Sequence, residues 1–252
     1  MNVLVILDGA TDRAGAAIEL DGMPELRRLR EDGETEWLDL LDPAVPVGSE
    51  TAIASLLGWR PDGPVDRGLV EAAARGLEPE AGEHVWRIDV DGHRVLLFGD
   101  APRLTAAVPV RVWPAGLRPP PILDRSTVVV GAAGAATGLG ALMGARTVVP
   151  PGATGRPGSD LAAKRAAALA VLDAGAAHVV VHVGGADEAG HARDALAKAA
   201  VLQAADHELI GPLAATVRER GGRIQVGPDH GCDPATGDHV GGPVPHVVWS
   251  SG

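Results

Sequence analysis

Short β-branched runs that alternate with Ala- and Leu-rich segments are the feature that most restricts the fold of this chain. Runs such as VLVIL (residues 3–7) and VVVHV (residues 179–183) are almost continuously apolar. Such runs are typical of strands that are buried on both faces of a mainly parallel sheet. The alternation of strands and helices therefore predicts an α/β sandwich with helices on both faces of the sheet.

The same pattern gives the bounds of each expected element. The predicted strands are Asn2–Leu7, Trp37–Leu41, His84–Val90, Arg94–Phe98, Thr127–Val130, Arg146–Val149, His178–Val183, Arg223–Val226 and His246–Trp249. The predicted helices are Pro24–Glu31, Glu50–Leu57, Val70–Gly76, Ala132–Met143, Asp160–Ala174 and Asp194–Arg220.

The alternation is interrupted at residues 91–122, where a short hairpin-like pattern leads into the Pro-rich sequence AVPVRVWPAGLRPPPIL. We interpret this segment as a small insertion, or cap, on a core formed by residues 1–90 and 123–252. A long surface loop with two edge strands fits the same residues equally well.

Composition excludes several classes of function. The chain has 252 residues, of which 46% are hydrophobic, and this fits one large domain with or without an insertion. Its formal net charge of −11 argues against a protein that binds nucleic acid or an anionic membrane. An anionic substrate remains compatible, because bound divalent cations can reverse the local field.

Targeting features point to a cytoplasmic protein. The N-terminal MNVLVILDG predicts a first strand rather than a signal peptide. No apolar run approaches the roughly 20 residues that span a bilayer. The single cysteine, Cys232, permits neither an internal disulfide nor a Cys-based zinc site. A reduced, cytoplasmic protein is therefore expected.

Ionisable residues come after three of the predicted strands. Asp8 follows VLVIL. Asp187, Glu188 and His191 come after VVVHV, and Asp229 and His230 come after RIQV. Ligands of open α/β sheets bind beyond the carboxyl ends of the strands. These side chains are therefore expected to meet at one edge of the sheet.

Two sequences carry the candidate metal ligands. In GGADEAGHARD, Asp187 and His191 are spaced i, i+4, so that a helix or tight turn would place both on one face. A carboxylate and an imidazole together suit Mn²⁺, Zn²⁺ or Fe²⁺ better than Ca²⁺. A solvated helix start also produces this spacing.

The second sequence is PDHGCDPATGDH, at residues 228–239. Asp229 and His230 are adjacent and could contact two different metals, or one metal through a bend, and His239 can fold back across the loop. An exposed acidic loop is the alternative. Asp233 and Asp238 are interpreted as turn residues, and Cys232 as a neighbour of the site rather than a ligand.

Ser49 in PVGSETAIASLLGW precedes a helical pattern and has two interpretations. Serine is a favoured N-cap residue, although Ala52 stands where a capping box would have an acid. Alternatively, Ser49 is a nucleophile at a helix N-terminus, where the helix dipole and free N–H groups favour a phosphoserine. A neighbouring metal would lower the pKa of its hydroxyl.

Taken together, the motifs carry a family resemblance. The chain resembles the archaeal-type cofactor-independent phosphoglycerate mutases of the alkaline phosphatase superfamily. The matching segments occur in the family's order: ILDGATD, PVGSETAIASLLGW, DRGLVEAAARG, HVWRIDVDG, VVPPGATGRPGSDLAAKRAAAL, VVVHVGGADEAGHARD and PDHGCDPATGDHVGGPVPHVVW. The resemblance implies a three-layer alkaline phosphatase-like sandwich whose mainly parallel sheet is covered on both faces.

The resemblance also implies a role for each matching residue. One divalent metal would be bound by Asp8, Ser49, Asp229 and His230, with Ser49 as the nucleophile that accepts the phosphoryl group. A second metal would be bound by Asp187, His191 and His239. Arg67 and Arg87 match substrate-contacting positions, and the metals would be Mn²⁺, Zn²⁺ or Mg²⁺. The implied activity is phosphoryl transfer on a small phosphorylated metabolite.

The chain departs from the family in two ways. The family's large cap is reduced here to residues 91–122, and Thr137 stands where the family usually has a lysine. A mutase must keep its acceptor bound and exclude water, so both departures favour hydrolysis over mutase chemistry. A phosphodiesterase or nucleotide- or phosphonate-processing enzyme, and a non-catalytic relative, are the alternatives. Three further arginines near the motifs could also face the site, and the sequence does not indicate which of them does: Arg13, Arg156 and Arg193.

Overall fold

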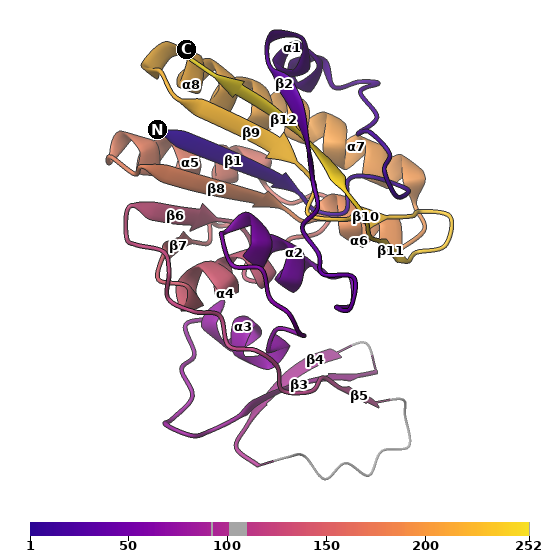
Figure 1. Ribbon diagram of the computed structural model, residues 1–252, viewed down its shortest axis with the longest axis vertical. Helices are drawn as coiled ribbons and strands as arrows, with labels where there is room; N and C mark the ends of the chain where they lie inside the picture. Colours follow the sequence, from indigo (N-terminus) through magenta and orange to yellow (C-terminus); the bar gives the residue numbers. More distant parts are fainter. Residues whose placement is uncertain (92, 101–109, 252) are drawn as a thin grey trace.

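A seven-stranded sheet forms the centre of the molecule in the computed structural model, which describes residues 1–91, 93–100 and 110–251 (Figure 1). Its strand order is β2-β12-β9-β1-β8-β6-β7. In chain order these strands are β1 (Asn2–Leu7), β2 (Glu34–Leu38), β6 (Thr127–Val130), β7 (Arg146–Val148), β8 (His178–Val183), β9 (Arg223–Gly227) and β12 (Val244–Ser250).

All neighbouring strands from β9 to β7 pair in parallel, and only β12 runs antiparallel to its neighbours β9 and β2. The predicted α/β sandwich with a mainly parallel sheet is thereby confirmed. The carboxyl ends of β1, β8 and β9 point to the same edge of the sheet (Figure 1).

Helices cover both faces of this sheet. In chain order they are α1 (Pro24–Asp32), α2 (Ser49–Leu56), α3 (Arg67–Ala73), α4 (Ala135–Leu142), α5 (Leu161–Asp173), α6 (Gly185–His191), α7 (Ala195–Ala205), a π-helical turn η1 (Asp206–Ile210) and α8 (Gly211–Arg220).

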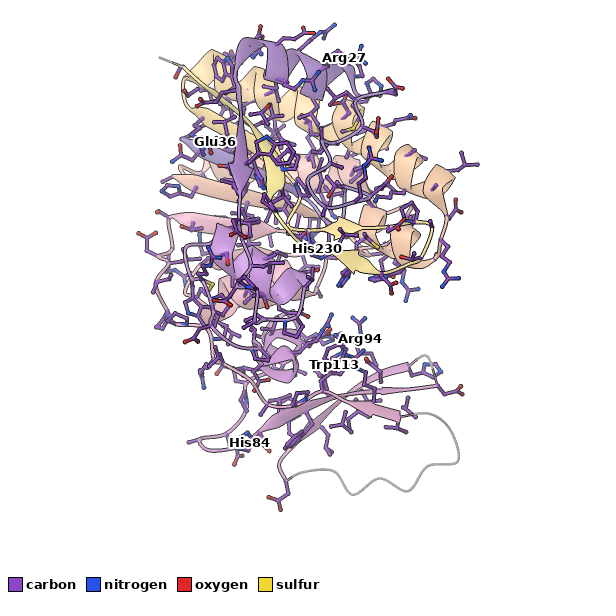
Figure 2. All side chains as sticks on the ribbon, turned by 45° about the vertical axis from the view of Figure 1, so that its right-hand side comes forward. Arg27, Glu36, His84, Arg94, Trp113 and His230 are labelled. Carbon is purple, nitrogen blue, oxygen red and sulfur yellow. The ribbon has the colours of Figure 1, made fainter. Side chains whose placement is uncertain are left out.

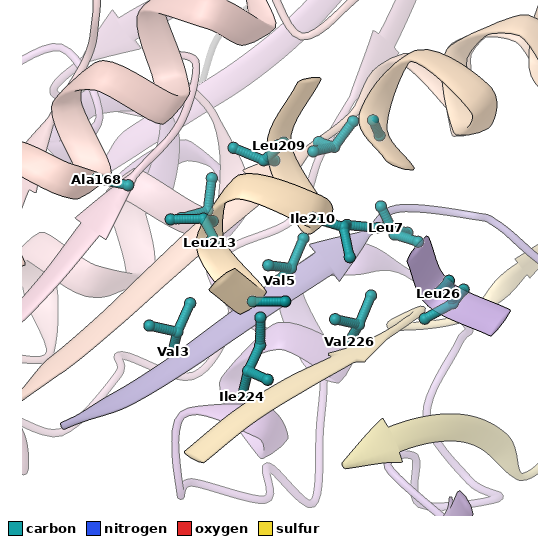
Figure 3. Close-up of a cluster of buried hydrophobic side chains, with 14 of the residues drawn as sticks. Val3, Val5, Leu7, Leu26, Ala168, Leu209, Ile210, Leu213, Ile224 and Val226 are labelled. Atoms are coloured by element: carbon teal, nitrogen blue, oxygen red, sulfur yellow. The ribbon is translucent and has the colours of Figure 1, made fainter. Parts of the chain in front are cut away.

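Residues of β1 alternate between two cores because successive side chains of a strand point to opposite faces. Val3, Val5 and Leu7 pack in the larger core, with side chains of α1, α5, η1 and α8 (Figure 3). Ile6 packs in the second core, with side chains of α2, α3 and α4. The strand is therefore apolar at nearly every position, as a strand covered on both faces must be.

Several element boundaries differ from the sequence-based expectation, among them α4, predicted at Ala132–Met143, and β12, predicted at His246–Trp249. Two of the differences have a clear cause. The strand predicted at Trp37–Leu41 is instead β2 at Glu34–Leu38, an edge strand whose register is set by pairing with β12. Its sequence, ETEWL, is largely exposed, so no apolar run marks it, whereas Leu40 and Leu41 are buried beyond its end. The helix predicted to begin at Val70 begins at Arg67, where the Asp66 carboxylate accepts a hydrogen bond from Leu69 N.

The single helix predicted at Asp194–Arg220 is interrupted by the π-helical turn η1. Pro212 has no N–H to donate to the carbonyl four residues earlier. That carbonyl belongs to Glu208, and it accepts a hydrogen bond from Arg165 Nη1 of α5 at 3.0 Å instead. The proline therefore breaks the regular helix, and a side chain of α5 satisfies the carbonyl that it leaves without its helical partner.

A second, antiparallel sheet, in the order β4-β3-β5, lies apart from the main sheet (Figure 1). It consists of β3 (Val85–Val90), β4 (His93–Phe98) and β5 (Val110–Val112), and we call it the small sheet. Residue 92 and residues 101–109 of the predicted cap lie outside the described residues. The division into a core and a cap at residues 91–122 stays a prediction.

Among the residues that the structure describes, no helix combines the length and the apolar character that crossing a bilayer requires.

Candidate metal centre

Three strand ends bring acidic residues together at the carboxyl edge of the sheet. Asp8 follows β1, Asp187 lies on α6 directly after β8, and Asp229 follows β9. Gly9 permits this approach: its φ is +64°, and a Cβ at this position would lie 2.7 Å from Asp187 Oδ1. Gly9 N also donates to Asp229 Oδ1 at 3.2 Å. The glycine of the ILDG motif therefore lets the three carboxylates converge.

Ser49 is the first residue of α2 and faces this group. Its Oγ donates to Asp8 Oδ1 at 3.3 Å and lies 3.1 Å from His230 Nε2. Gly48 occupies the N-cap position, and no side chain caps the helix. The N-cap interpretation of Ser49 is therefore wrong, and its hydroxyl contacts the candidate metal ligands instead of capping the helix.

Asp187, His191 and His239 form a second group. His191 Nε2 lies 3.2 Å from Asp187 Oδ2, one helical turn earlier on α6, and His239 Nε2 lies 3.5 Å from Asp187 Oδ1. A two-residue antiparallel ribbon, β10 (Gly231–Cys232) with β11 (His239–Val240), carries His239 back across the loop. The structure thus brings together all seven residues predicted to bind metal.

A backbone carbonyl orients each of the three predicted imidazole ligands. His191 Nδ1 lies 2.7 Å from Gly237 O, His230 Nδ1 lies 3.0 Å from Gly231 O, and His239 Nδ1 lies 3.1 Å from Val47 O. A carbonyl only accepts hydrogen bonds, so each Nδ1 carries a proton and each ring turns its Nε2 toward the site. Outer partners of this kind are typical of histidines that bind metal.

His182, near the end of β8, is a site residue that the sequence did not reveal. Its Nε2 is buried, lies 3.2 Å from Asp8 Oδ2 and makes no hydrogen bond to any described residue. Burial lowers the pKa of its imidazole to about 4. The only sign of this residue in the sequence was that it is the one polar residue of VVVHV. A continuously apolar strand does not indicate toward which face of the sheet that histidine points.

The electrostatics of the group favour bound cations. Burial, and then the carboxylates of Asp229 and Asp187, raise the pKa of Asp8 well above its usual value. Burial would also raise the pKa of Asp187, but His239 and the other nearby imidazoles outweigh it and lower that pKa to about 2. Crowded carboxylates of this kind disfavour one another's charge unless a cation lies between them.

The donor atoms also fit metal ions geometrically. Ligand atoms lie within 4.8 Å of one another in three overlapping sets: Asp187–His191–His239, Asp8–His182–Asp229 and Asp8–Asp187–His230. Asp187 Oδ1 and Asp229 Oδ2 are buried and accept no hydrogen bond from the described residues. The Nε2 atoms of His191 and His239 are 2.9 Å apart, where two lone pairs would repel unless a proton or a cation lay between them. The residues present therefore fit divalent cations.

The two predicted substrate-binding arginines lie in different surroundings. Arg67, at the start of α3, forms an ion pair through Nε with Glu50, the neighbour of Ser49. Arg87, on β3, is 4% exposed, donates from Nη1 to Glu71 Oε1 at 3.0 Å, and donates from Nε and Nη2 to Asp89. Their roles as substrate contacts stay predictions.

The remaining loop residues near the motifs take structural roles. The Asp233 carboxylate accepts from Ala235 N at 2.8 Å, which is the expected turn interaction. Cys232 is buried, and burial together with Asp187 raises the pKa of its thiol to about 12, so the thiol stays protonated. Arg193 donates from Nε to Thr236 O and joins the end of α6 to this loop.

A comparison with known families decides the classification. The sequence model of the Metalloenzyme superfamily matches residues 2–252 of this chain. The chain belongs to the Metalloenzyme superfamily. This member is similar to the 2,3-bisphosphoglycerate-independent phosphoglycerate mutase of Methanopyrus kandleri, with 27% identity over 374 residues, 99% of this chain and 87% of that protein.

A second relative of this metalloenzyme is phosphoglycerate mutase 2 of Methanothermobacter thermautotrophicus, 33% identical over 168 residues. That match covers 64% of this chain and only 41% of the relative. These relatives confirm the resemblance inferred from the motifs.

Solved structures agree on the fold. The PH0037 protein from Pyrococcus horikoshii has a TM-score of 0.81 at 24% identity, covering 100% of this chain and 85% of that one. Alkaline phosphatase from the Antarctic bacterium TAB5 has a TM-score of 0.51 at 12% identity, covering 99% and 90%. The predicted alkaline phosphatase-like sandwich is confirmed.

Proposed function

We propose that this protein is a metal-dependent phosphoryl-transfer enzyme that forms a phosphoserine at Ser49. The observation that carries the proposal is the position of Ser49 Oγ, 3.3 Å from Asp8 Oδ1 and 3.1 Å from His230 Nε2, in a group of buried carboxylates and imidazoles. The N-terminus of α2 at Ser49 adds backbone N–H groups that favour the phosphate. A cytoplasmic location, with Cys232 reduced, belongs to the same proposal.

Two sets of residues would hold the cations. Asp8, Ser49, Asp229 and His230 form the first, with His182 as an added candidate, and Asp187, His191 and His239 form the second. Two divalent ions held there would lower the pKa of the serine hydroxyl and neutralise phosphoryl oxygens.

The substrate we propose is a small phosphorylated metabolite rather than a nucleic acid or a membrane. Arg67 supports this proposal because its ion pair with Glu50 places a guanidinium group next to the residue that follows Ser49. Guanidinium groups match phosphate and carboxylate oxygens through paired hydrogen bonds. We propose Arg67 as the substrate contact from the core.

Hydrolysis is the outcome that we favour over mutase chemistry. Thr137 is 1% exposed, and its Oγ1 donates to Ala132 O and accepts from Gly134 N at the start of α4. Its side chain supplies no cation where the sequence resemblance expects a lysine. A site without that cation and with a small cap is less able to retain the dephosphorylated acceptor against water.

The test uses Mn²⁺-loaded protein and 3-phosphoglycerate, with 2-phosphoglycerate and inorganic phosphate measured in the same reaction. We expect phosphate release to exceed mutase product, and Ser49→Ala to abolish both. Efficient conversion to 2-phosphoglycerate without release would refute hydrolysis. Turnover that survives in Ser49→Ala would refute the phosphoserine, and faster cleavage of bis-p-nitrophenyl phosphate would favour the phosphodiesterase alternative.

A further inference from the structure

One face of the small sheet gathers arginine side chains around Trp113. Strand pairing places Asp89 of β3 opposite both Arg94 of β4 and Arg111 of β5. Side chains two residues apart share a face, so Arg87 and Trp113 lie on this face as well. Arg94 and Trp113 project from the small sheet toward the side of the core that carries His230 (Figure 2). We call this the arginine face.

Trp113 contacts three guanidinium groups at once. The Cζ atoms of Arg111, Arg67 and Arg87 lie 3.6, 4.3 and 5.0 Å from the centre of its ring. Its indole N–H donates to Asp89 Oδ2 at 2.6 Å, which fixes the plane of the ring. Tryptophan is the aromatic residue that attracts cations most strongly. A single side chain therefore orients arginines from the core and from the small sheet.

The chain of contacts leads from Trp113 to the nucleophile. Arg67, which lies over the ring, pairs through Nε with Glu50, and Glu50 follows Ser49 in sequence. Trp113 thus holds the arginine face against the segment that carries Ser49.

The arginines of this face differ in their capacity to bind a ligand. Arg87 is 4% exposed, and its interactions with Glu71 and Asp89 occupy all three of its nitrogens. The side chain of Arg94 is 46% exposed, although it also reaches Glu71, and Arg111 is exposed. Burial, and then the charges of Arg67 and Arg94, lower the pKa of Arg87. Crowded guanidinium groups that repel one another are stabilised by an anion.

We propose that Trp113 is a positioning residue that aligns Arg67 and Arg111 to bind a second anionic group, a carboxylate or phosphate, on the substrate whose phosphoryl group Ser49 accepts. This inference rests on the proposed function and adds the basis of its substrate selectivity. Arg87 supports the arrangement through Asp89 and Glu71 instead of touching the substrate.

The test compares Trp113→Phe with Trp86→Phe. Trp86 is the matched control because it lies in the same small sheet, on the opposite face, and its N–H donates to Gly99 O at 3.1 Å. The substrates are 3-phosphoglycerate, which has a second anionic group, and p-nitrophenyl phosphate, which lacks one.

For Trp113→Phe we expect KM for 3-phosphoglycerate to rise about tenfold, with kcat within twofold, because the cation–π contacts weaken and the hydrogen bond to Asp89 is lost. Both parameters for p-nitrophenyl phosphate should stay within twofold of wild type. Trp86→Phe should leave both substrates unchanged, and Arg111→Ala should repeat the selective rise in KM. Equal effects on the two substrates, or an unchanged KM for 3-phosphoglycerate, would overturn the inference.

Calorimetric binding of 3-phosphoglycerate to the Mn²⁺-loaded protein separates this inference from the proposed function. In Ser49→Ala, which should not turn over, adding Trp113→Phe should raise Kd about tenfold. If the wild type does not turn over 3-phosphoglycerate but the two variants still differ in Kd, the proposed reaction is refuted and the anion site is retained. Equal Kd values for the two variants would refute the role of Trp113 alone.

Discussion

Single side chains in the candidate metal centre are oriented before any ligand binds. The carbonyls of Gly237, Gly231 and Val47 hold the imidazoles of His191, His230 and His239, respectively, so that each Nε2 is presented to the carboxylates. Little rotamer freedom then remains to be lost when a cation binds.

Another imidazole, that of His246, is held in its neutral form away from the centre. It is fully buried, its Nε2 lies 2.8 Å from Pro228 O, and its Nδ1 lies 3.0 Å from Gln225 Nε2. Gly227 makes room for the ring, since a Cβ there would overlap it. Burial lowers the pKa of His246 to about 4. The amide N–H of Gln225 faces the lone pair of His246 Nδ1. A proton on that nitrogen would need an acceptor there instead.

The first prediction concerns stability against pH. An unfolded histidine binds a proton near pH 6.5, whereas folded His246 does so only near pH 4. The unfolded state therefore binds more protons between these values, and the free energy of unfolding falls as the pH drops from about 6.5 to about 4, by roughly 3 kcal/mol for this group. Urea unfolding of wild type and His246→Gln at pH 7.5, 6 and 5 measures how much His246 contributes to this pH dependence. Identical pH dependence in the two proteins would exclude His246 as its source.

At the scale of elements, α1 depends on a distant residue for its N-terminus. Met23 occupies its N-cap position and has no side-chain oxygen to accept hydrogen bonds. Asp206 of the π-helical turn η1 supplies the carboxylate instead, accepting from Glu25 N at 2.9 Å and Leu26 N at 2.8 Å. The side chain is buried, so these bonds compensate the cost of its burial. The break in the long helix and the start of α1 are therefore one structural unit.

The second prediction is that Asp206→Ala lowers the free energy of unfolding by about 2 kcal/mol, because two N–H groups at a helix N-terminus lose their acceptor. Asp206→Asn should cost less, since it keeps one oxygen. Asp21→Ala is the control: its carboxylate is fully exposed and lies as far as 3.9 Å from Arg27 Nη2, so its loss should leave stability unchanged. Unfolding in guanidinium chloride measures the free energy of unfolding of all three variants. Similar losses for Asp206→Ala and Asp21→Ala would contradict the capping role.

At the scale of the whole molecule, the candidate metal centre joins parts of the chain that are far apart in sequence. It draws side chains from α2, β8, α6 and β11, and from the segments that follow β1 and β9. Cations bound there would connect all of these elements, and they would offset part of the formal charge of −11.

The third prediction is that Mn²⁺ at about 100 times its Kd raises Tm by roughly 5–10 °C, because ligand binding stabilises only the folded state. A chelator should reverse the gain. Metal analysis should find two equivalents in wild type and one in Asp187→Asn, and Asp233→Asn, a turn residue, should behave like wild type. Equal metal content in wild type and Asp187→Asn would show that the second site is wrongly assigned.

The sequence alone determined the elements whose signal is local. Asn2–Leu7, Thr127–Val130 and His178–Val183 are strands with the predicted bounds, because strands covered on both faces must be continuously apolar. The convergence of Asp8, Asp187 and Asp229 was also predictable from sequence, since parallel strands carry the residues beyond their carboxyl ends to one edge of the sheet.

The tertiary structure alone decided features that depend on long-range contact. Strand β2 is polar and exposed, so only its pairing with β12 places it. The face taken by His182, the capping of α1 by Asp206 and the arginine contacts of Trp113 each join residues that no local pattern relates. Periodicity records which residues are buried within one element, whereas the partner that satisfies a buried charge or ring is chosen by the packing of distant elements against each other.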